Sequence, residues 1–166
     1  MAIVDSILME LDQEAKTTQR VLDRVPEGKL TWKPHAKSYS LGQLALHIAR
    51  GQGALADAAD QEVFVFSGNP QAQPASVKEI MDAFAQSTAH AKEVLGKMDD
   101  QRITANWSAT AGGKTIMAVP RIVFIRAILM NHIYHHRGQL SVYLRLLDVP
   151  VPSIYGPSAD ENPFMG

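Results

Sequence analysis

Histidine is the residue of this chain whose spacing most directly suggests chemistry. Six histidines are present, and His132 and His136 lie four residues apart within the segment 128–140. An apolar stripe with steps of three and four residues runs through the segment and includes both of them: Leu129, His132, His136, Leu140, Tyr143 and Leu147. Side chains at i and i+4 lie one turn apart on one helix face, so both imidazoles can reach a common point. This is the spacing of metal ligands.

A third histidine, His47, falls on the inner face of another expected helix. Ser40 and Gln43 have the S-x-x-Q form of a capping box, which predicts a helix that begins after Ser40 and fades near Ala59. His47 then shares a face with Leu44 and points toward the interior. Three neutral imidazoles around an open position form a site for a divalent metal such as zinc or nickel. The uncompensated 2+ charge would lower the pKa of a water or thiol at that position.

The same pattern has plainer interpretations. The three histidines can be core residues that are hydrogen-bonded to neighbours, or His132 and His136 can flank a polar cleft without metal. The H-x-x-x-H spacing lacks the glutamate of the helical zinc motif, so spacing alone leaves these alternatives open. No Glu-x-x-His pair is present, which argues against a di-iron carboxylate bundle. His135 lies one step off the stripe, His35 lies in a connection, and His90 lies off the stripe of its helix.

Four long amphipathic segments predict four helices, at residues 3–25, 40–59, 77–98 and 120–147. A capping box from Ser76 to Glu79 precedes the third, and Pro120 suits the first turn of the fourth. Residues 61–75 hold a short strand-like run followed by loop residues, and residues 101–118 are irregular with a weakly signalled hairpin. Because no sheet is convincingly indicated, we expect an all-α four-helix bundle, whose long second and third connections leave room for crossovers.

The composition fits one globular domain, residues 1–166. Hydrophobic residues make up 46% and charged residues 20%; 16 basic and 17 acidic residues give a net charge of −1 without blocks of like charge. This pattern does not indicate binding to nucleic acid or to an anionic membrane. The chain contains no cysteine, which excludes disulfides, zinc–thiolate sites and a cysteine nucleophile. Without a signal-peptide pattern or a membrane-spanning stretch, we expect a cytoplasmic protein.

Two segments resemble the DinB-like family, whose relatives include bacillithiol transferases and mycothiol-dependent maleylpyruvate isomerases. The run HIYHHRGQ that begins at His132, with the residues that follow it to Pro152, is similar to the final helix of that family. Residues 32–48 are similar to the entry into its second helix, where the first ligand histidine sits, here His47. The resemblance covers nearly the whole chain. It implies a four-helix bundle of DinB type, commonly dimeric, with a metal on His47, His132 and His136.

The resemblance does not specify the reaction, because the family includes thiol transferases and many members without an assigned activity. Our first hypothesis is a metal-dependent thiol S-transferase, in which a zinc, nickel or iron ion binds a low-molecular-weight thiol and presents it to a small-molecule electrophile. The second is a metal-dependent hydrolase, which needs a general base near the site. The third is a non-catalytic, metal-stabilised dimeric module. We expect a homodimer that binds no nucleic acid and no membrane.

Other side chains have weaker claims to a role. Arg137 and Gln139 flank the ligand helix at positions turned partly away from the site, and we expect Arg137 to face solvent or a dimer partner. In the proline-rich tail, Tyr155, Asp160 and Glu161 could cover the metal mouth or accept a hydrogen bond from a ligand histidine. Equally, Tyr155 could simply fasten the tail to the bundle.

Two tryptophans and one glycine complete the set of singled-out residues. Trp32 and Trp107 are expected to anchor loops. Gly138, inside the fourth helix, costs roughly 1 kcal/mol relative to alanine, which predicts a close neighbour at that point.

Overall fold

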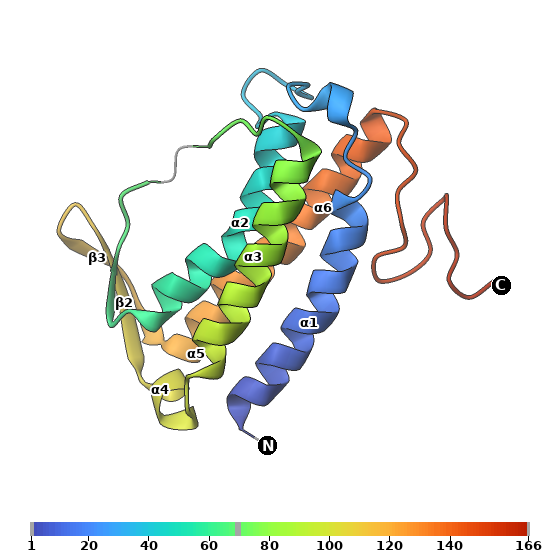
Figure 1. Ribbon diagram of the computed structural model, residues 1–166. Coiled ribbons are helices and arrows are strands. Elements are labelled where there is room, and N and C mark those ends of the chain that lie inside the picture. Colours follow the sequence, from blue (N-terminus) through green and yellow to red (C-terminus); the bar gives the residue numbers. More distant parts are fainter. Residues whose placement is uncertain (1, 69–70, 166) are drawn as a thin grey trace.

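Four long helices form the body of the molecule in the computed structural model, which describes residues 2–68 and 71–165 (Figure 1). They are α1 (Ile3–Leu22), α2 (Leu41–Asp60), α3 (Val77–Gly96) and α6 (Asn131–Leu146). Both α3 and α6 pack against α1 and α2, which therefore lie diagonally opposite each other. The expected helical bundle is confirmed. Among the described residues, no helix is both long and apolar enough to cross a bilayer.

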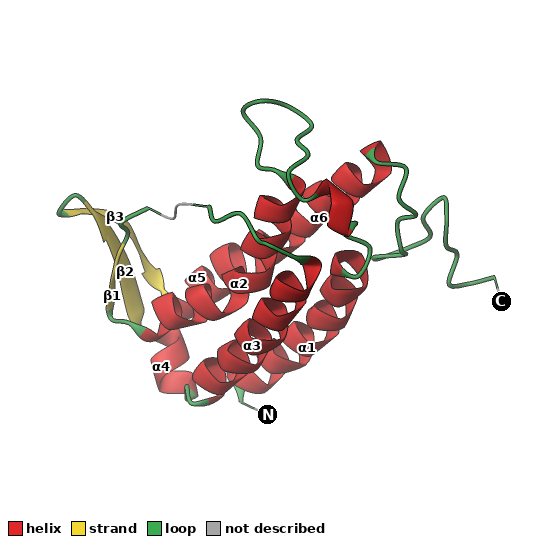
Figure 2. Ribbon diagram, turned by 45° about the horizontal axis from the view of Figure 1, so that its top comes forward, coloured by secondary structure: helices red, strands yellow, loops and turns green. Residues whose placement is uncertain are grey.

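The direction of the helices requires one crossover. α1 and α6 run one way along the bundle, and α2 and α3 run the other way (Figure 1). Since α2 and α3 are neighbours that point in the same direction, their connection returns along the bundle, about 30 Å for a helix of 20 residues. The long second connection predicted such a crossover. The C-terminal tail lies on the side of the bundle away from the small sheet (Figure 2).

Side-chain caps fix where α2 and α3 begin, as the sequence predicted. Ser40 Oγ accepts from the Gln43 N–H (3.1 Å), and Gln43 Oε1 accepts from the Ser40 N–H (2.9 Å). At α3, Ser76 Oγ accepts from the Glu79 N–H (3.1 Å). Because an N-cap sets the first turn of its helix, Ser40 also sets the position of His47 two turns later.

A three-stranded sheet stands at one end of the bundle, and it contains the strand-like run and the hairpin that the sequence signalled only weakly. It consists of β1 (Val63–Val65), β2 (Asn106–Ala111) and β3 (Lys114–Pro120), with β2 in the middle, parallel to β1 and antiparallel to β3. Gly112 and Gly113 turn the hairpin with positive φ angles of 54° and 76°, which glycine adopts without strain. Residues 100–104, expected to be irregular, form the short helix α4 (Asp100–Thr104).

Both tryptophans anchor their segments. Trp107 is buried in β2 and stacks on Phe124, with ring centroids 4.0 Å apart. Trp32 follows the 3₁₀ turn η1 (Glu27–Lys29) and packs edge-on against Tyr143 of α6 at 5.7 Å. Each ring ties an irregular segment to the helical core, as expected.

The fourth predicted helix is continuous but not uniform. It begins with α5 (Arg121–Phe124) after Pro120, passes through the π-helical segment η2 (Ile125–Met130), and continues as α6. A π segment contains wider turns, with hydrogen bonds to the fifth residue, so it rotates the faces that precede and follow it relative to each other. Hydrophobic periodicity did not reveal this change.

The outer face of α6 carries exposed apolar residues. A Cβ at Gly138 would meet no atom of the described residues within 4 Å, so the expected close neighbour is not found among them. Val142 and Leu146, four and eight residues further along the same face, are both exposed.

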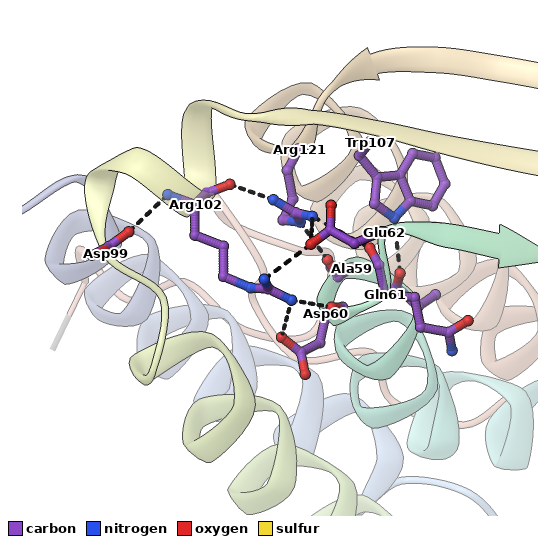
Figure 3. A network of polar contacts seen from close by, with 9 residues as sticks. Ala59, Asp60, Gln61, Glu62, Asp99, Arg102, Trp107 and Arg121 are labelled. Carbon is purple, nitrogen blue, oxygen red and sulfur yellow. Dashed lines mark hydrogen bonds and ion pairs between the residues drawn. The ribbon is translucent and has the colours of Figure 1, made fainter.

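Side chains from the region around the sheet hold the C-terminal end of α2 (Figure 3). The Trp107 indole N–H donates to the Ala58 carbonyl (2.9 Å), and Arg121 Nε–H donates to the Ala59 carbonyl (2.7 Å). The fully buried Arg121 guanidinium also donates to the carbonyl of Arg102 in α4. The last carbonyls of a helix lack donors within the helix and carry partial negative charge, so these contacts satisfy them and join α2 to α4 and α5.

We expect Arg121→Met to lower the free energy of unfolding by about 3 kcal/mol, because three backbone carbonyls and Glu62 lose a buried donor. Urea denaturation measures this loss. The matched control is Arg126→Met, which removes a side chain that is 50% exposed from its ion pair with Glu10 and should cost less than about 1 kcal/mol. Equal losses in the two variants would contradict the importance of the buried contacts.

Candidate metal centre

Three imidazole nitrogens converge where α2 packs against α6. His47 Nε2 lies 2.8 Å from His132 Nε2 and 3.2 Å from His136 Nε2. The three ligand atoms all lie within 4.8 Å of one another, and each ring is half-buried. The structure thus brings together the three histidines of the predicted site in a group that could hold a metal ion.

The local helix geometry leaves space for this group. His132 and His136 lie one turn apart on α6, with ring centroids 4.4 Å apart. On α2, Gly51 follows His47 by one turn, and a Cβ there would lie only 3.2 Å from Cε1 and 3.3 Å from Nδ1 of His132. Real Cβ atoms rarely come so close to a neighbour, so the glycine provides the room for the His132 ring.

Two glutamines bind the histidines from outside the group. His136 Nδ1 lies 2.7 Å from Gln139 Oε1. Because an amide oxygen only accepts, Nδ1 carries the proton, and Nε2 keeps its lone pair for the centre of the group. Gln71 likewise forms a side-chain hydrogen bond with His47. Metal-binding histidines use partners of this kind to fix tautomer and orientation.

Sequence reasoning missed both glutamines as partners of the site. Gln139 lies three residues after His136, a helical spacing that permits the contact, although it was thought to point partly away. Gln71 lies in the long connection between α2 and α3, where no periodic pattern predicts which way a side chain points.

Burial keeps the rings neutral. It lowers the pKa of His47 from 6.5 to about 4 and that of His132 to about 3, and repulsion from the charged form of His136 acts in the same direction on both. Burial also lowers the pKa of His136. All three rings are therefore neutral at pH 7, which is the state in which an imidazole coordinates a metal.

The donor set fits a divalent ion. Zn–N bonds of about 2.0–2.1 Å at tetrahedral angles separate ligand nitrogens by about 3.3 Å, close to the 3.2 Å between the Nε2 atoms of His47 and His136. Without a proton or cation between them, lone pairs on His47 and His132 at 2.8 Å would repel each other. No Asp or Glu of the described residues joins the group, so an ion held there would keep open coordination positions.

Comparison with known proteins identifies the family. The profile described as "DinB family" matches residues 2–163. The chain belongs to the DinB family. The Bacillus subtilis (strain 168) protein named "Uncharacterized protein YrdA" is 26% identical over 163 residues, which cover 95% of this chain and 91% of YrdA.

Two crystal structures share the DinB fold of this chain. A DinB-like protein from Bacillus cereus ATCC 10987 gives a TM-score of 0.72 at 24% identity, over 93% of this chain and 98% of the other. The DinB-like protein YjoA from Bacillus subtilis gives a TM-score of 0.67 at 16% identity, over 86% of this chain and 92% of YjoA. At these identities the likeness supports the fold alone.

The remaining histidines of this DinB-family chain do not join the group. His135 is exposed on α6, with its ring centroid 4.8 Å from that of His136. His90 on α3 pairs with Asp57, with 2.6 Å between Nε2 and Oδ1. His35 lies in the loop before α2, where Nδ1 accepts a backbone N–H at 3.1 Å.

The interpretation of Arg137 as a solvent-facing or dimer-contacting residue was wrong. Its side chain is 1% exposed; Nη2 lies 2.7 Å from Glu14 Oε2, and Nη1–H donates to Thr18 Oγ1 (3.1 Å). The Tyr155 hydroxyl donates to the same carboxylate (2.9 Å). Glu14 lies between Leu11 and Thr18 on the inner stripe of α1, and a carboxylate in that place needs a cationic partner. The position of Glu14 on the inner stripe was therefore the feature of the sequence that could have predicted a buried arginine.

The tail residues fasten the tail instead of covering the three histidines. Asp160 pairs with Arg145, and Glu161 pairs with Arg20. Hydrogen bonds from these arginines hold the pKa of both carboxyl groups below their usual values, so both remain charged near neutral pH. Tyr155 is bound to Glu14 and Arg137, as described above. For Tyr155 this is the fastening role considered above. Asp160 and Glu161, considered only as a cover or as acceptors for a ligand histidine, instead form ion pairs that hold the tail.

We expect the metal-loaded protein to hold one zinc, nickel or iron(II) ion per chain. His132→Ala and His136→Ala should each weaken binding by at least about 100-fold, because losing a ligand costs more than losing its hydrogen-bond partner. Elemental analysis after gel filtration measures the occupancy. His135→Ala, the matched control on the same helix, should keep its ion. Full occupancy in either ligand variant would refute the assignment.

Proposed function

We propose that this DinB-family protein is a metal-dependent transferase that joins a low-molecular-weight thiol to a small electrophilic substrate. The observation that carries the proposal is the place of His47, which borders two cavities on α2. One cavity of about 170 Å³ includes Arg50 and Gln71. The other, of about 430 Å³, includes His132. Two cavities that meet at a set of metal-ligating nitrogens suit a reaction between two substrates.

The lining of the two cavities favours a thiol over water as the nucleophile. Among the described residues, neither cavity is lined by Asp or Glu. A hydrolase needs a positioned general base or proton shuttle. The exposed His135 and Tyr39 have ring contacts with the group, and neither of them lines either cavity. A divalent ion held by three neutral imidazoles would stabilise a thiolate at neutral pH, where a free thiol with a pKa near about 8.5 is mostly protonated.

The residues of the chain then have separate tasks. The three neutral rings hold the ion without cancelling its charge, and Gln139 keeps His136 in the required tautomer. Arg50, which also lies 3.3 Å from Glu79, presents a cation to the smaller cavity, where it can receive the carboxylate of a thiol cofactor. In the transfer, the sulfur supplies the electron pair of the new C–S bond, the leaving group departs with the pair of the broken bond, and the thiol proton passes to water.

The absence of cysteine agrees with this reaction, because the sulfur nucleophile must then come from a cofactor. We propose the cytoplasm as its compartment, since thiols are kept reduced there. The hydrolase and the non-catalytic metal-stabilised module remain as alternatives.

We expect thiol consumption with a chromogenic electrophile to require both metal and thiol, and to fall at least about 100-fold in His47→Ala, which loses a ligand. Asp160→Asn should retain activity within about twofold, because Asp160 binds Arg145 away from both cavities. A stopped-flow or absorbance assay with a panel of low-molecular-weight thiols measures the rates. Ester or amide cleavage without thiol would favour the hydrolase. No activity in either assay, together with a large fall in melting temperature when a chelator removes the metal, would favour the structural module.

We further propose that the protein is a homodimer that pairs through the outer face of α6. Gly138, Val142 and Leu146 lie on this face, and the missing side chain at Gly138 lets another backbone approach closely. Exposed apolar side chains in a row are typical of an interface.

Sedimentation velocity at micromolar concentration should show a dimer for the unmodified protein and a monomer for the double variant Val142→Glu/Leu146→Glu, in which carboxylates would be buried at the interface. Met9→Glu, which changes an exposed apolar residue on α1, is the matched control and should remain dimeric. A monomer for the unmodified protein would refute the proposal.

A further inference from the structure

An apolar cavity lies directly beside the three-histidine group. Its volume of about 430 Å³ falls within the range of small-molecule sites. α2, the sheet and the η2 segment form its walls, and the rings of His47 and His132 line one part of it. None of the described residues around it is Asp, Glu, Lys or Arg. The cavity therefore offers contact to apolar groups next to the candidate metal centre.

One wall of this cavity is an aromatic stack. The Trp107 ring lies between Phe124, with centroids 4.0 Å apart and planes at 27°, and Phe64, at 6.5 Å and 18°. Trp107 is buried, and its indole N–H is bound to the Ala58 carbonyl. Because the stack is already fixed, a ligand that packs against it loses little free energy to ordering the wall.

The rim of the cavity exposes apolar side chains to water. Val65, Phe66 and Ile116 are 64%, 50% and 58% exposed, and all three line the cavity. Leaving large apolar side chains in water is unfavourable, and their grouping around one cavity indicates a surface that a ligand covers.

The π segment supplies a fourth observation. Ile128, within η2, and His132, just after it, both line the cavity. π turns are rare, and those found inside α-helices are frequently at functional sites. Here it lets one helix present an apolar side chain and an imidazole to the same space.

We propose that this cavity binds the electrophilic substrate, and that this substrate is an uncharged small molecule with a flat, apolar ring. The proposal rests on the thiol transfer proposed above and names its substrate class. A charged group would lose its hydration here without gaining a partner, whereas a ring gains contact with the aromatic wall. The reactive carbon lies toward the histidines, where it forms its bond to the thiol sulfur as the leaving group departs with the bonding electron pair.

Binding is tested without any reaction, by fluorescence titration of the metal-loaded protein with the uncharged two-ring probe N-phenyl-1-naphthylamine. We expect one saturable site per chain. Val65→Asp and Ile116→Asp should each weaken it by at least about tenfold, because an aspartate at the cavity would be desolvated without a partner. Val63→Asp is the matched control: it lies on the same strand, is 50% exposed and does not line the cavity, so the affinity should stay within about twofold.

Catalysis is tested by comparing 1-chloro-2,4-dinitrobenzene with the small anion iodoacetate, each with the same thiol panel. We expect kcat/KM to favour the aromatic electrophile. Val65→Asp should lower kcat/KM for it, whereas the control Val63→Asp, outside the cavity, should leave it within about twofold. If the cavity variants weaken probe binding but neither the unmodified protein nor any variant transfers a thiol, the ligand class is supported and the proposed reaction is refuted.

Three results would overturn the inference while leaving the proposed function intact. They are thiol transfer without preference for the aromatic electrophile, probe binding that Val65→Asp does not weaken, and the absence of probe binding. If the probe does not bind and the cavity variants convert a dimer to a monomer, a second copy of the chain covers the cavity.

Discussion

The buried guanidinium of Arg121 at the C-terminal end of α2 is the contact on which the arrangement of the site depends. α2 carries His47, and the helical path that begins at Arg121 carries His132 and His136. By donating to the Ala59 carbonyl at 2.7 Å, Arg121 fixes the start of that path against the end of α2. Since helices are stiff, this joint determines which level of α2 lies beside His132 and His136. The Trp107 indole donates to the preceding carbonyl, that of Ala58, so the joint also places the sheet that walls the apolar cavity.

A polar layer between two apolar clusters carries the chemistry. On α6, Ile133 belongs to the cluster near the sheet and Leu140 to the cluster at the other end; His136 and Arg137 lie between them. The two polar residues are satisfied differently. Arg137 has a full set of partners in Glu14, Thr18 and Tyr155, and it holds α6 against α1. The Nε2 atoms of His47, His132 and His136 converge on one another, and lone pairs directed at a common point favour a cation there.

The sequence indicated the bundle and the histidine group because both rest on local patterns. The stripe through His132 and His136 and the cap at Ser40 each depend on residues within a turn or two, where the helical period fixes direction. The features that it indicated weakly or not at all depend mainly on distant partners. The sheet forms because β1 pairs with β2 across more than forty residues, as in the Val63 to Ser108 register. The burial of Arg137 was not predicted because its partner Glu14 lies on another helix. The π-helical form of η2 was not predicted because a π turn leaves the composition of an apolar run unchanged.

The form of the histidine group bears on whether it serves stability or chemistry. A structural zinc site is normally closed by four protein ligands, which leaves no position for a substrate. Here three imidazoles converge, and two of them line a cavity with exposed apolar residues at its rim. If the group served stability alone, longer side chains from the sheet could fill that space and add buried apolar area. The chain instead keeps a cavity beside neutral donors, an arrangement that is costly for stability and useful for binding a second molecule.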